Sequence, residues 1–278
     1  MSRLASVADS RYSHGMNDRQ LAFEGVENFR DFGGYATTTG ATLRRGRLFR
    51  SGHHNRATDA DLARFDQLGI ATVVDLRRSS ERQDQPSRRS PGFGGLVIEN
   101  PDAEIVEAPH VSFLRNTDLT EDAVRGFMIE TYRAMPFDPR HQAMFRRYFE
   151  ALQAGEGAVV IHCAAGKDRT GLLAALTHHA LGVSRDDLMQ DYLATNAAVR
   201  LQERAPEIRR HIQKTYGRPA SDEAVIAFLG VEPAFIESAF AAIDARHGSL
   251  DGYLAEVLGV DAAARERLAA RLTDQKAR

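Results

Sequence analysis

The fold of this 278-residue chain is decided by the stretch Val159-Val160-Ile161-His162-Cys163-Ala164-Ala165-Gly166-Lys167-Asp168-Arg169-Thr170-Gly171. It begins as a β-branched run, which is typical of a buried strand. After the small residues that follow, positions 172–176 continue as an apolar helix. The loop between them lies at a helix N-terminus, where backbone N–H groups lack partners and the helix dipole adds positive charge. Such a loop is predicted to bind an anion, and phosphate above all.

Two side chains at the ends of this loop give it chemistry. Cys163 begins the loop and Arg169 ends it, where the helix starts. A thiol at a helix N-terminus beside a guanidinium ionises readily, and the planar guanidinium can hold two phosphoryl oxygens. Gly166 lets the backbone approach the ligand closely. The combination favours phosphoryl transfer through a phosphocysteine.

The run from His162 to Gly171 resembles the signature of the cysteine-dependent phosphatases. Its Lys167-Asp168 pair is similar to that of one branch, the bacterial atypical (dual- or triple-specificity) tyrosine phosphatases. Some members of that branch also act on phosphoserine, phosphothreonine and phosphoinositides. Two further stretches carry the resemblance, which extends from about Glu27 onward: Asn28-Phe29-Arg30-Asp31-Phe32-Gly33-Gly34-Tyr35 and Val74-Asp75-Leu76-Arg77.

The resemblance implies a mechanism and a site. The Cys163 thiolate attacks phosphorus, Arg169 and the loop amides bind the equatorial oxygens, and water hydrolyses the phosphocysteine. No metal or other cofactor is needed. The residues expected to bind phosphate are Cys163, Ala164, Ala165, Gly166, Lys167, Asp168 and Arg169.

Four side chains around the loop have expected supporting roles. The leaving alcohol needs a proton, and by the resemblance Asp168 is the first choice of acid, with bracing of Arg169 as its alternative. Lys167 adds charge at the mouth, which suits substrates with a second phosphate, although a solvated lysine would look the same. His162 is expected to order the loop by hydrogen bonding and to tune the thiolate. Thr170 could stabilise the thiolate leaving group, or simply cap or pack the helix.

Polar residues elsewhere have structural interpretations. Asp138 has a plausible separation for an upstream general acid, but its position favours a helix cap. Asp75 ends a predicted strand and is expected to hold Arg77 or the loop rather than face the pocket. Arg50 is expected to be a surface arginine, with a minor substrate-side role as the alternative.

The order of elements predicts an α/β fold. Thr58 with Asp61 predicts a helix start, and Thr120, Asp138 and Ser184 predict three more. A buried strand follows at 70–77, and strand, helix, strand in succession indicates an α/β layer. Residues 79–95 are predicted as loop, 96–98 as strand and 101–116 as irregular. The pair Arg30-Asp31 is expected to pin a turn.

We therefore predict a cysteine-phosphatase-like α/β fold, with a central mostly parallel sheet flanked by helices and a helical C-terminal part. Residues 1–20 are polar and aperiodic and are predicted to be a mobile arm. Residues 21–278 are predicted to form a single phosphatase domain. By the resemblance, helices of the region from about 199 to 278 could form a lid over the site.

Composition excludes several classes of protein. Hydrophobic residues make up 43% and charged residues 27%, as in ordinary globular proteins. A net charge of −2 argues against a nucleic-acid binder, and a single cysteine excludes an intramolecular disulfide. No apolar run reaches the roughly 18 residues of a transmembrane helix, and no secretory signal is visible. The expected partner is a phosphorylated protein or a phosphoinositide, and the expected location is cytoplasmic, or exported without a visible signal peptide.

Two other functions compete with the phosphatase interpretation. A rhodanese-like sulfurtransferase also places a cysteine in an anion-binding loop, but His162 and the Arg169-Thr170 ending argue against it. A catalytically silent phosphate-binding module is disfavoured because every expected catalytic residue is present. Thiosulfate turnover would identify the first, and phosphate binding without turnover the second.

Overall fold

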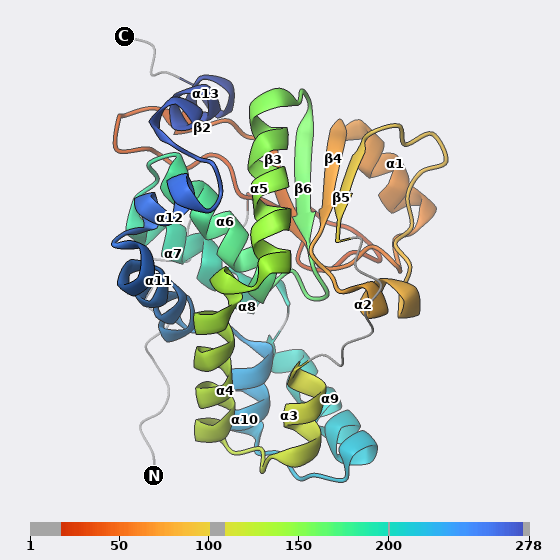
Figure 1. The fold of residues 1–278 in the computed structure, drawn as a ribbon. Helices are drawn as coiled ribbons and strands as arrows, with labels where there is room; N and C mark the ends of the chain where they lie inside the picture. Colours follow the sequence, from red (N-terminus) through yellow and green to blue (C-terminus); the bar gives the residue numbers. More distant parts are fainter. Residues whose placement is uncertain (1–17, 101–108, 200, 275–278) are drawn as a thin grey trace.

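The centre of the molecule is a five-stranded sheet in the order β1-β3-β6-β4-β5. The computed structural model describes residues 18–100, 109–199 and 201–274. β1 is antiparallel to β3, and the other neighbours are parallel. Helices flank this sheet (Figure 1), so the predicted fold class is confirmed. The strands are β1 (Arg30–Asp31), β3 (Leu48–Ser51), β4 (Ile70–Asp75), β5 (Leu96–Glu99) and β6 (Ala158–His162), and a separate antiparallel pair is β2 (Thr42–Leu43) with β7 (Thr273–Asp274).

The strand β6 occupies the middle of the sheet because all its residues are apolar or buried and can be covered on both faces. Its side chains alternate between two apolar clusters, as strand geometry requires. Val160 faces the smaller cluster with α1 (Asp59–Gln67), while its two neighbours face the larger one. The larger cluster is built with α5 (Pro139–Ala154) and α6 (Asp168–Ala180).

Side-chain caps begin the helices at the predicted positions. The Thr58 hydroxyl accepts the Asp61 backbone N–H, and the Asp61 carboxylate accepts the Thr58 N–H, which completes a capping box for α1. The other predicted caps are also confirmed: Thr120 before α4 (Glu121–Ala134), Asp138 before α5 and Ser184 before α7 (Arg185–Leu193).

Two helices were not predicted. α2 (Ser79–Asp84) lies in the segment predicted as loop, and α3 (Pro109–Asn116) in the segment predicted as irregular. No residue of α2 is buried, so its sequence has no apolar periodicity from which a helix could be predicted. Leu114 is the sole fully buried residue of α3. The rest of that irregular segment, 101–108, lies outside the described residues.

A helical lobe stands at the end of the sheet to which the parallel strands point (Figure 1). It comprises α3, α4, α9 (Leu201–Tyr216) and α10 (Asp222–Leu229). These helices have an apolar cluster of their own, made of Leu114, Leu119, Ala205, Ile212 and Val225. The lobe thus has an apolar cluster of its own, while α4 and α10 also contribute residues to the larger cluster under the sheet.

The predicted helical C-terminal part is confirmed, with the short strand β7 as an exception. Its remaining helices return from the lobe to the sheet body (Figure 1). Among the described residues, no single helix is long and apolar enough to span a bilayer; α10 and α11 meet the criterion only as a pair bent by 50°. The elements not yet placed are the 3₁₀ helix η2 (Met135–Phe137), α8 (Thr195–Ala198), α11 (Pro233–His247), α12 (Leu250–Glu256) and α13 (Ala262–Leu272).

The segment predicted as a mobile arm falls mostly outside the described residues, which begin at Asp18. Its last residues lie against the body of the protein. The Arg19 carbonyl accepts the Asp31 N–H at 3.0 Å, and the Arg19 side chain donates to the Gly33 carbonyl at 2.6 Å. Arg19, in the segment predicted as an arm, is therefore held against the fold.

Candidate active site

The loop that follows β6 has the predicted strand–loop–helix form. Cys163 begins it, directly after the strand, and α6 starts at Asp168. The Cys163 side chain is 3% exposed. Gly166 has a φ of +67°, and a Cβ at this position would lie 2.3 Å from the carbonyl oxygen of Ser51. Glycine is required here for both reasons, because the loop is pressed against the end of β3.

The carbonyl groups of this loop are held from behind. The Asn28 side-chain amide donates to the carbonyls of Ala165 (2.9 Å) and Gly166 (3.0 Å), and Arg50 Nη2 donates to the same Gly166 carbonyl (3.0 Å). In a trans peptide the N–H points opposite to the C=O. The N–H groups of Gly166 and Lys167 therefore point to the opposite side, away from Asn28 and Arg50. No acceptor for either N–H occurs in the part of the chain that the structure describes. The loop presents free donors to an anion.

A buried charge network supports those carbonyl contacts. Asp191 on α7 accepts Arg50 Nη1 at 2.6 Å through one oxygen and Arg30 Nε at 3.3 Å through the other. Arg30 also donates to Thr195 Oγ1 at 3.0 Å and to the Asn28 side-chain oxygen. The side chains of both arginines and Asp191 are at most 3% exposed. Two strands and a helix therefore fix the back of the loop.

Two predictions about these residues are wrong. Arg30 does not pair with Asp31; the Asp31 carboxylate instead accepts the backbone N–H groups of Gly33 (2.8 Å) and Gly46 (2.7 Å). Arg50 is not a surface arginine, because every residue of β3 is buried and Arg50 itself is 0% exposed; its side chain binds a carbonyl of the loop instead. The buried charge of Arg50 is tolerated because the buried carboxylate of Asp191 forms an ion pair with it.

Arg169 is held in a fixed orientation by an acid on α2. Its Nη1 donates to Glu81 Oε2 (2.6 Å) and to the Leu76 carbonyl (3.1 Å), and its Nη2 donates to Glu81 Oε1 (2.8 Å). Burial opposes both charges, but the ion pair outweighs it: the pKa of Arg169 is raised and that of Glu81 is lowered to about 2. Of the five guanidinium N–H groups, Nε–H and one on Nη2 have no partner among the described residues. This adjacent pair is the edge that can bind two oxygens of an anion.

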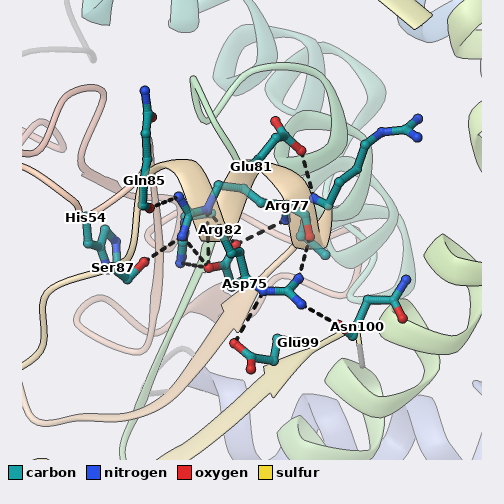
Figure 2. Close-up of polar contacts among 12 residues, drawn as sticks. His54, Asp75, Arg77, Glu81, Arg82, Gln85, Ser87, Glu99 and Asn100 are labelled. Atoms are coloured by element: carbon teal, nitrogen blue, oxygen red, sulfur yellow. Dashed lines mark hydrogen bonds and ion pairs between the residues drawn. The ribbon is translucent and has the colours of Figure 1, made fainter. Parts of the chain in front are cut away.

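The helix α2 that carries this acid is itself anchored to the sheet. Asp75, at the end of β4, accepts Arg77 Nε at 2.9 Å and Nη2 at 2.7 Å. Arg77 then donates to the Gln85 carbonyl (2.7 Å) and to Ser87 Oγ (2.8 Å), just beyond α2, and Arg82 donates back to the Arg77 carbonyl (2.7 Å). Figure 2 shows these contacts surrounding α2. The expectation that Asp75 holds Arg77 is confirmed.

The contacts of His162 in the structure are stacking and electrostatic ones, and its expected role in ordering the loop stays a prediction. Neither ring nitrogen has a hydrogen-bond partner in the described part of the chain. The ring stacks on His54 at 4.1 Å between centroids, and its Nε2 lies 3.6 Å from Asp75 Oδ2. Burial lowers the pKa of His162 to about 4, against the opposing effect of Asp75. The neutral, buried ring packs against His54, one position before Cys163 in the chain.

Asp168 and Lys167 are bound to other parts of the fold. Asp168 Oδ1 accepts the Tyr132 hydroxyl at 2.9 Å, and the Asp168 side chain is 29% exposed. Lys167 Nζ donates to the Phe228 carbonyl at the end of α10 (2.6 Å) and lies 3.5 Å from Asp168 Oδ1. Lys167 is only 5% exposed, so it is not the solvated lysine of the alternative interpretation.

The remaining candidates are structural or unpartnered. Asp138 caps α5, and its carboxylate also binds Arg140 at 2.7 Å, as expected for a cap rather than an acid. Thr170 is fully buried, and its hydroxyl has no partner among the described residues. A buried hydroxyl without a partner remains free to donate a hydrogen bond to an anionic group beside it.

Three residues of the site were not predicted from the sequence: Glu81, Tyr132 and Asp191. Each acts through a partner more than 30 positions away in the chain. Asp191 lies at helical spacing from Ser184, whose cap was predicted, but its pairing with the arginines was not. Glu81 and Tyr132 had no signal of their roles, because helix and cap rules describe neighbours in sequence alone.

Comparison with known proteins gives one family. A tyrosine phosphatase family matches residues 21–274 of this chain. A Cupriavidus necator protein assigned as a tyrosine-protein phosphatase is 34% identical over 243 residues, which are 87% of this chain and 85% of that protein. The triple specificity protein phosphatase PtpB of Mycobacterium tuberculosis is 34% identical over 258 residues, 83% of this chain and 91% of its own length. A tyrosine-protein phosphatase of Nostoc commune is 29% identical over 140 residues, covering 49% and 44%.

Proposed function

This chain belongs to the tyrosine phosphatase family, and we propose that it hydrolyses phosphate monoesters, phosphotyrosine first, through a phosphocysteine on Cys163. The observation that carries the proposal is the loop itself. Free backbone donors of Gly166 and Lys167 and the unpaired edge of Arg169 surround the position that follows β6, where Cys163 lies. That arrangement binds three oxygens of a phosphoryl group next to a nucleophile.

The reaction runs in two displacements. In the first, the Cys163 sulfur forms a bond to phosphorus while the phosphorus–oxygen bond of the ester breaks, and Asp168 gives its proton to the leaving oxygen. In the second, water attacks phosphorus, Asp168 takes back a proton, and the sulfur–phosphorus bond breaks. Arg169 and the loop N–H groups bind the equatorial oxygens in both steps. Free phosphate and the alcohol are the products.

Substrate breadth is part of the proposal. One relative is named for triple specificity, and we extend to this chain the hydrolysis of phosphoserine, phosphothreonine and phosphoinositides. Lys167 supports a second phosphate, since its ammonium lies beside Asp168. It must first release the Phe228 carbonyl that it binds here. Substrates with two phosphates therefore compete with α10 for this lysine.

The same contact supports the proposed lid. Phe228 lies in the last turn of α10, whose final carbonyls lack helical partners, and Lys167 supplies one. Arg204 on α9 forms an ion pair with Glu27 at 2.5 Å, between partly exposed side chains. The first contact attaches α10 to the loop from Cys163 to Arg169, here called the phosphate loop. The second contact attaches α9 to the segment before β1. We propose that these helices cover the site within one phosphatase domain, residues 21–278.

The general-acid assignment predicts a dependence on the leaving group. Asp168→Asn should lower kcat by roughly 10²-fold or more on a phosphoserine peptide, whose alkoxide must be protonated. On p-nitrophenyl phosphate, whose leaving group needs no proton, kcat should change little. The rates would be measured side by side with a phosphotyrosine peptide and a phosphoinositide, with chelator present.

Asp138→Asn is the matched control, because this carboxylate is bound by Arg140 and caps α5. Its ratio of rates on the two leaving groups should equal that of the wild type. A leaving-group dependence in Asp138→Asn instead of Asp168→Asn would transfer the acid role upstream. Turnover of thiosulfate by a wild type that hydrolyses no phosphate ester would favour the sulfurtransferase.

Glu81→Gln should separate kcat from KM. The substitution frees the guanidinium of Arg169 from its bidentate partner, so the fork is no longer aimed at the transition state, and kcat should fall by about tenfold to a hundredfold. It also removes a negative charge near the phosphate site, so KM should stay level or fall. Steady-state kinetics on p-nitrophenyl phosphate measure both constants.

Glu99→Gln is the control for that experiment. Glu99 pairs with Arg82 of the same helix at 3.7 Å but does not touch Arg169. Its kinetic constants should match the wild type. A Glu81→Gln enzyme with unchanged kcat would show that Arg169 is oriented without the acid.

A further inference from the structure

Two buried tyrosines form a hydrogen-bonded line that ends on Asp168. The Tyr192 hydroxyl donates to the Tyr132 hydroxyl at 2.8 Å, and the Tyr132 hydroxyl donates to Asp168 Oδ1 at 2.9 Å. Tyr132 lies near the end of α4 and is 0% exposed, and Tyr192 lies on α7 and is 1% exposed. Tyr132 of α4 thus contacts the carboxylate directly, and Tyr192 of α7 contacts it through Tyr132.

The two oxygens of Asp168 have different surroundings. Oδ1 has the Tyr132 hydroxyl and, at 3.5 Å, the Lys167 ammonium. Oδ2 has no partner among the described residues. A carboxylic acid that must protonate a leaving group needs one oxygen held and the other free to carry the proton. This asymmetry is what such an acid requires.

Both hydroxyls remain proton donors under the conditions of catalysis. Burial raises the pKa of Tyr132 and of Tyr192 well above the ordinary value, and the charge of Asp168 raises both further. Each hydroxyl hydrogen can then point along the line toward the carboxylate, which only accepts when it is ionised. The line has one direction, from Tyr192 to Asp168.

We propose that Tyr132, itself oriented by Tyr192, is a positioning residue that holds Oδ1 of Asp168 and so directs Oδ2 to the leaving oxygen. The proposal rests on the proposed function, in which Asp168 is the general acid. In the first step the proton moves from Oδ2 to the leaving oxygen, and the Tyr132 hydroxyl stabilises the carboxylate that results. In the second step the same oxygen takes a proton from the attacking water. The tyrosines exchange no proton with the substrate.

A merely structural role would look different. Buried tyrosine hydroxyls usually find a partner, and Asp168 could serve only as that partner. In that case, removing a hydroxyl would affect stability and would affect all substrates alike. If the hydroxyl positions the acid, its loss should be visible only where the acid is needed.

The test uses Tyr132→Phe, which removes the hydroxyl and leaves the ring. For a phosphoserine peptide, kcat should fall by about tenfold, the size expected for a lost hydrogen bond to a charged group. KM should stay within about twofold, and p-nitrophenyl phosphate turnover should be unchanged. In an Asp168→Asn background, adding Tyr132→Phe should cause no further loss, since the two residues act through one proton.

Two more variants complete the experiment. Tyr192→Phe leaves the Tyr132 hydroxyl on Asp168 and should show the same leaving-group pattern at about threefold. It also serves if Tyr132→Phe does not fold. Tyr148→Phe is the matched control, because this tyrosine is also 0% exposed and binds Thr177 Oγ1 at 3.0 Å, away from the loop. Its kinetic constants should equal those of the wild type.

The outcomes separate this proposal from the function on which it rests. Equal losses on all leaving groups, or further loss in the Asp168→Asn background, would overturn the positioning role alone. If Asp168→Asn itself showed no leaving-group dependence, the acid assignment would fail, and the positioning proposal with it. A loss confined to poor leaving groups in Tyr132→Phe, absent from Tyr148→Phe, would support it.

Discussion

Cys163→Ser should lower kcat by roughly 10⁴-fold or more on every phosphate ester, good and poor leaving groups alike. A serine hydroxyl at this position has the shape of the thiol but is a far weaker nucleophile, since it ionises far less readily than a thiol. The imidazole that precedes it in the chain, His162, is buried with its pKa lowered to about 4; it stacks on His54 and lies 3.6 Å from Asp75. Steady-state rates with p-nitrophenyl phosphate measure the loss.

The same variant should still bind its substrate. The loop donors and Arg169 are unchanged, so calorimetry should find the affinity for a phosphotyrosine peptide within about tenfold of the wild-type KM. Thr177→Ser, which removes one methyl group from the buried helix α6 and keeps the hydroxyl, is a control for general damage. A Cys163→Ser enzyme that keeps more than about one hundredth of the activity would exclude the phosphocysteine route.

Asp191→Ala should destabilise the protein by about 3–5 kcal/mol, because it leaves two buried guanidinium groups without their carboxylate. Arg50 is 0% and Arg30 3% exposed, so water cannot replace the lost partner. The loss should extend to activity, since Arg50 also binds the Gly166 carbonyl of the phosphate loop. Urea unfolding at pH 7 measures the free energy.

The pH of that measurement matters. Burial alone would raise the pKa of Asp191, but Arg30 and Arg50 outweigh it and hold the pKa well below its usual range. A carboxyl with a depressed folded-state pKa stabilises the fold fully above its unfolded pKa of about 4, and the contribution is lost as the pH falls below that value. The difference between Asp191→Ala and the wild type should therefore be complete at neutral pH.

Asp186→Ala provides the comparison, because Asp186 lies exposed in the first turn of the same helix. Its loss removes a favourable dipole contact of about 0.3–1 kcal/mol. An Asp191→Ala protein as stable as Asp186→Ala would mean that the arginines find other partners.

Local chemistry explains which parts of the site the sequence could predict. The loop from Cys163 to Arg169 was predictable because strand, small residues and helix are contiguous, and the caps at Thr58 and Asp138 were predictable for the same reason. Arg50 was misassigned because a charged residue in a strand usually faces water. Its partner, Asp191, lies 141 positions later. No rule based on nearest neighbours could pair them.

The same distance in sequence explains why Glu81 was missed. Glu81 binds Arg169 across 88 positions, and nothing in the polar segment around it distinguishes this glutamate from its exposed neighbours. Its role follows from how Asp75 and Arg77 anchor α2, which is a property of the assembled sheet. Cys163 and Arg169 could be singled out from the sequence, but the acid that orients Arg169 required the tertiary structure.

The buried polar network that supports the loop carbonyls also affects how late in folding the site can form. Arg30 and Asp191 are 161 positions apart, and Asn28 reaches the Gly166 carbonyl across 138. Contacts between such distant segments form late, because the chain between them must first lose its freedom. α6 can form from local contacts, while the loop at its start acquires its shape only when β1, β3 and α7 have met. We therefore expect catalytic competence to be among the last properties that a refolding molecule acquires.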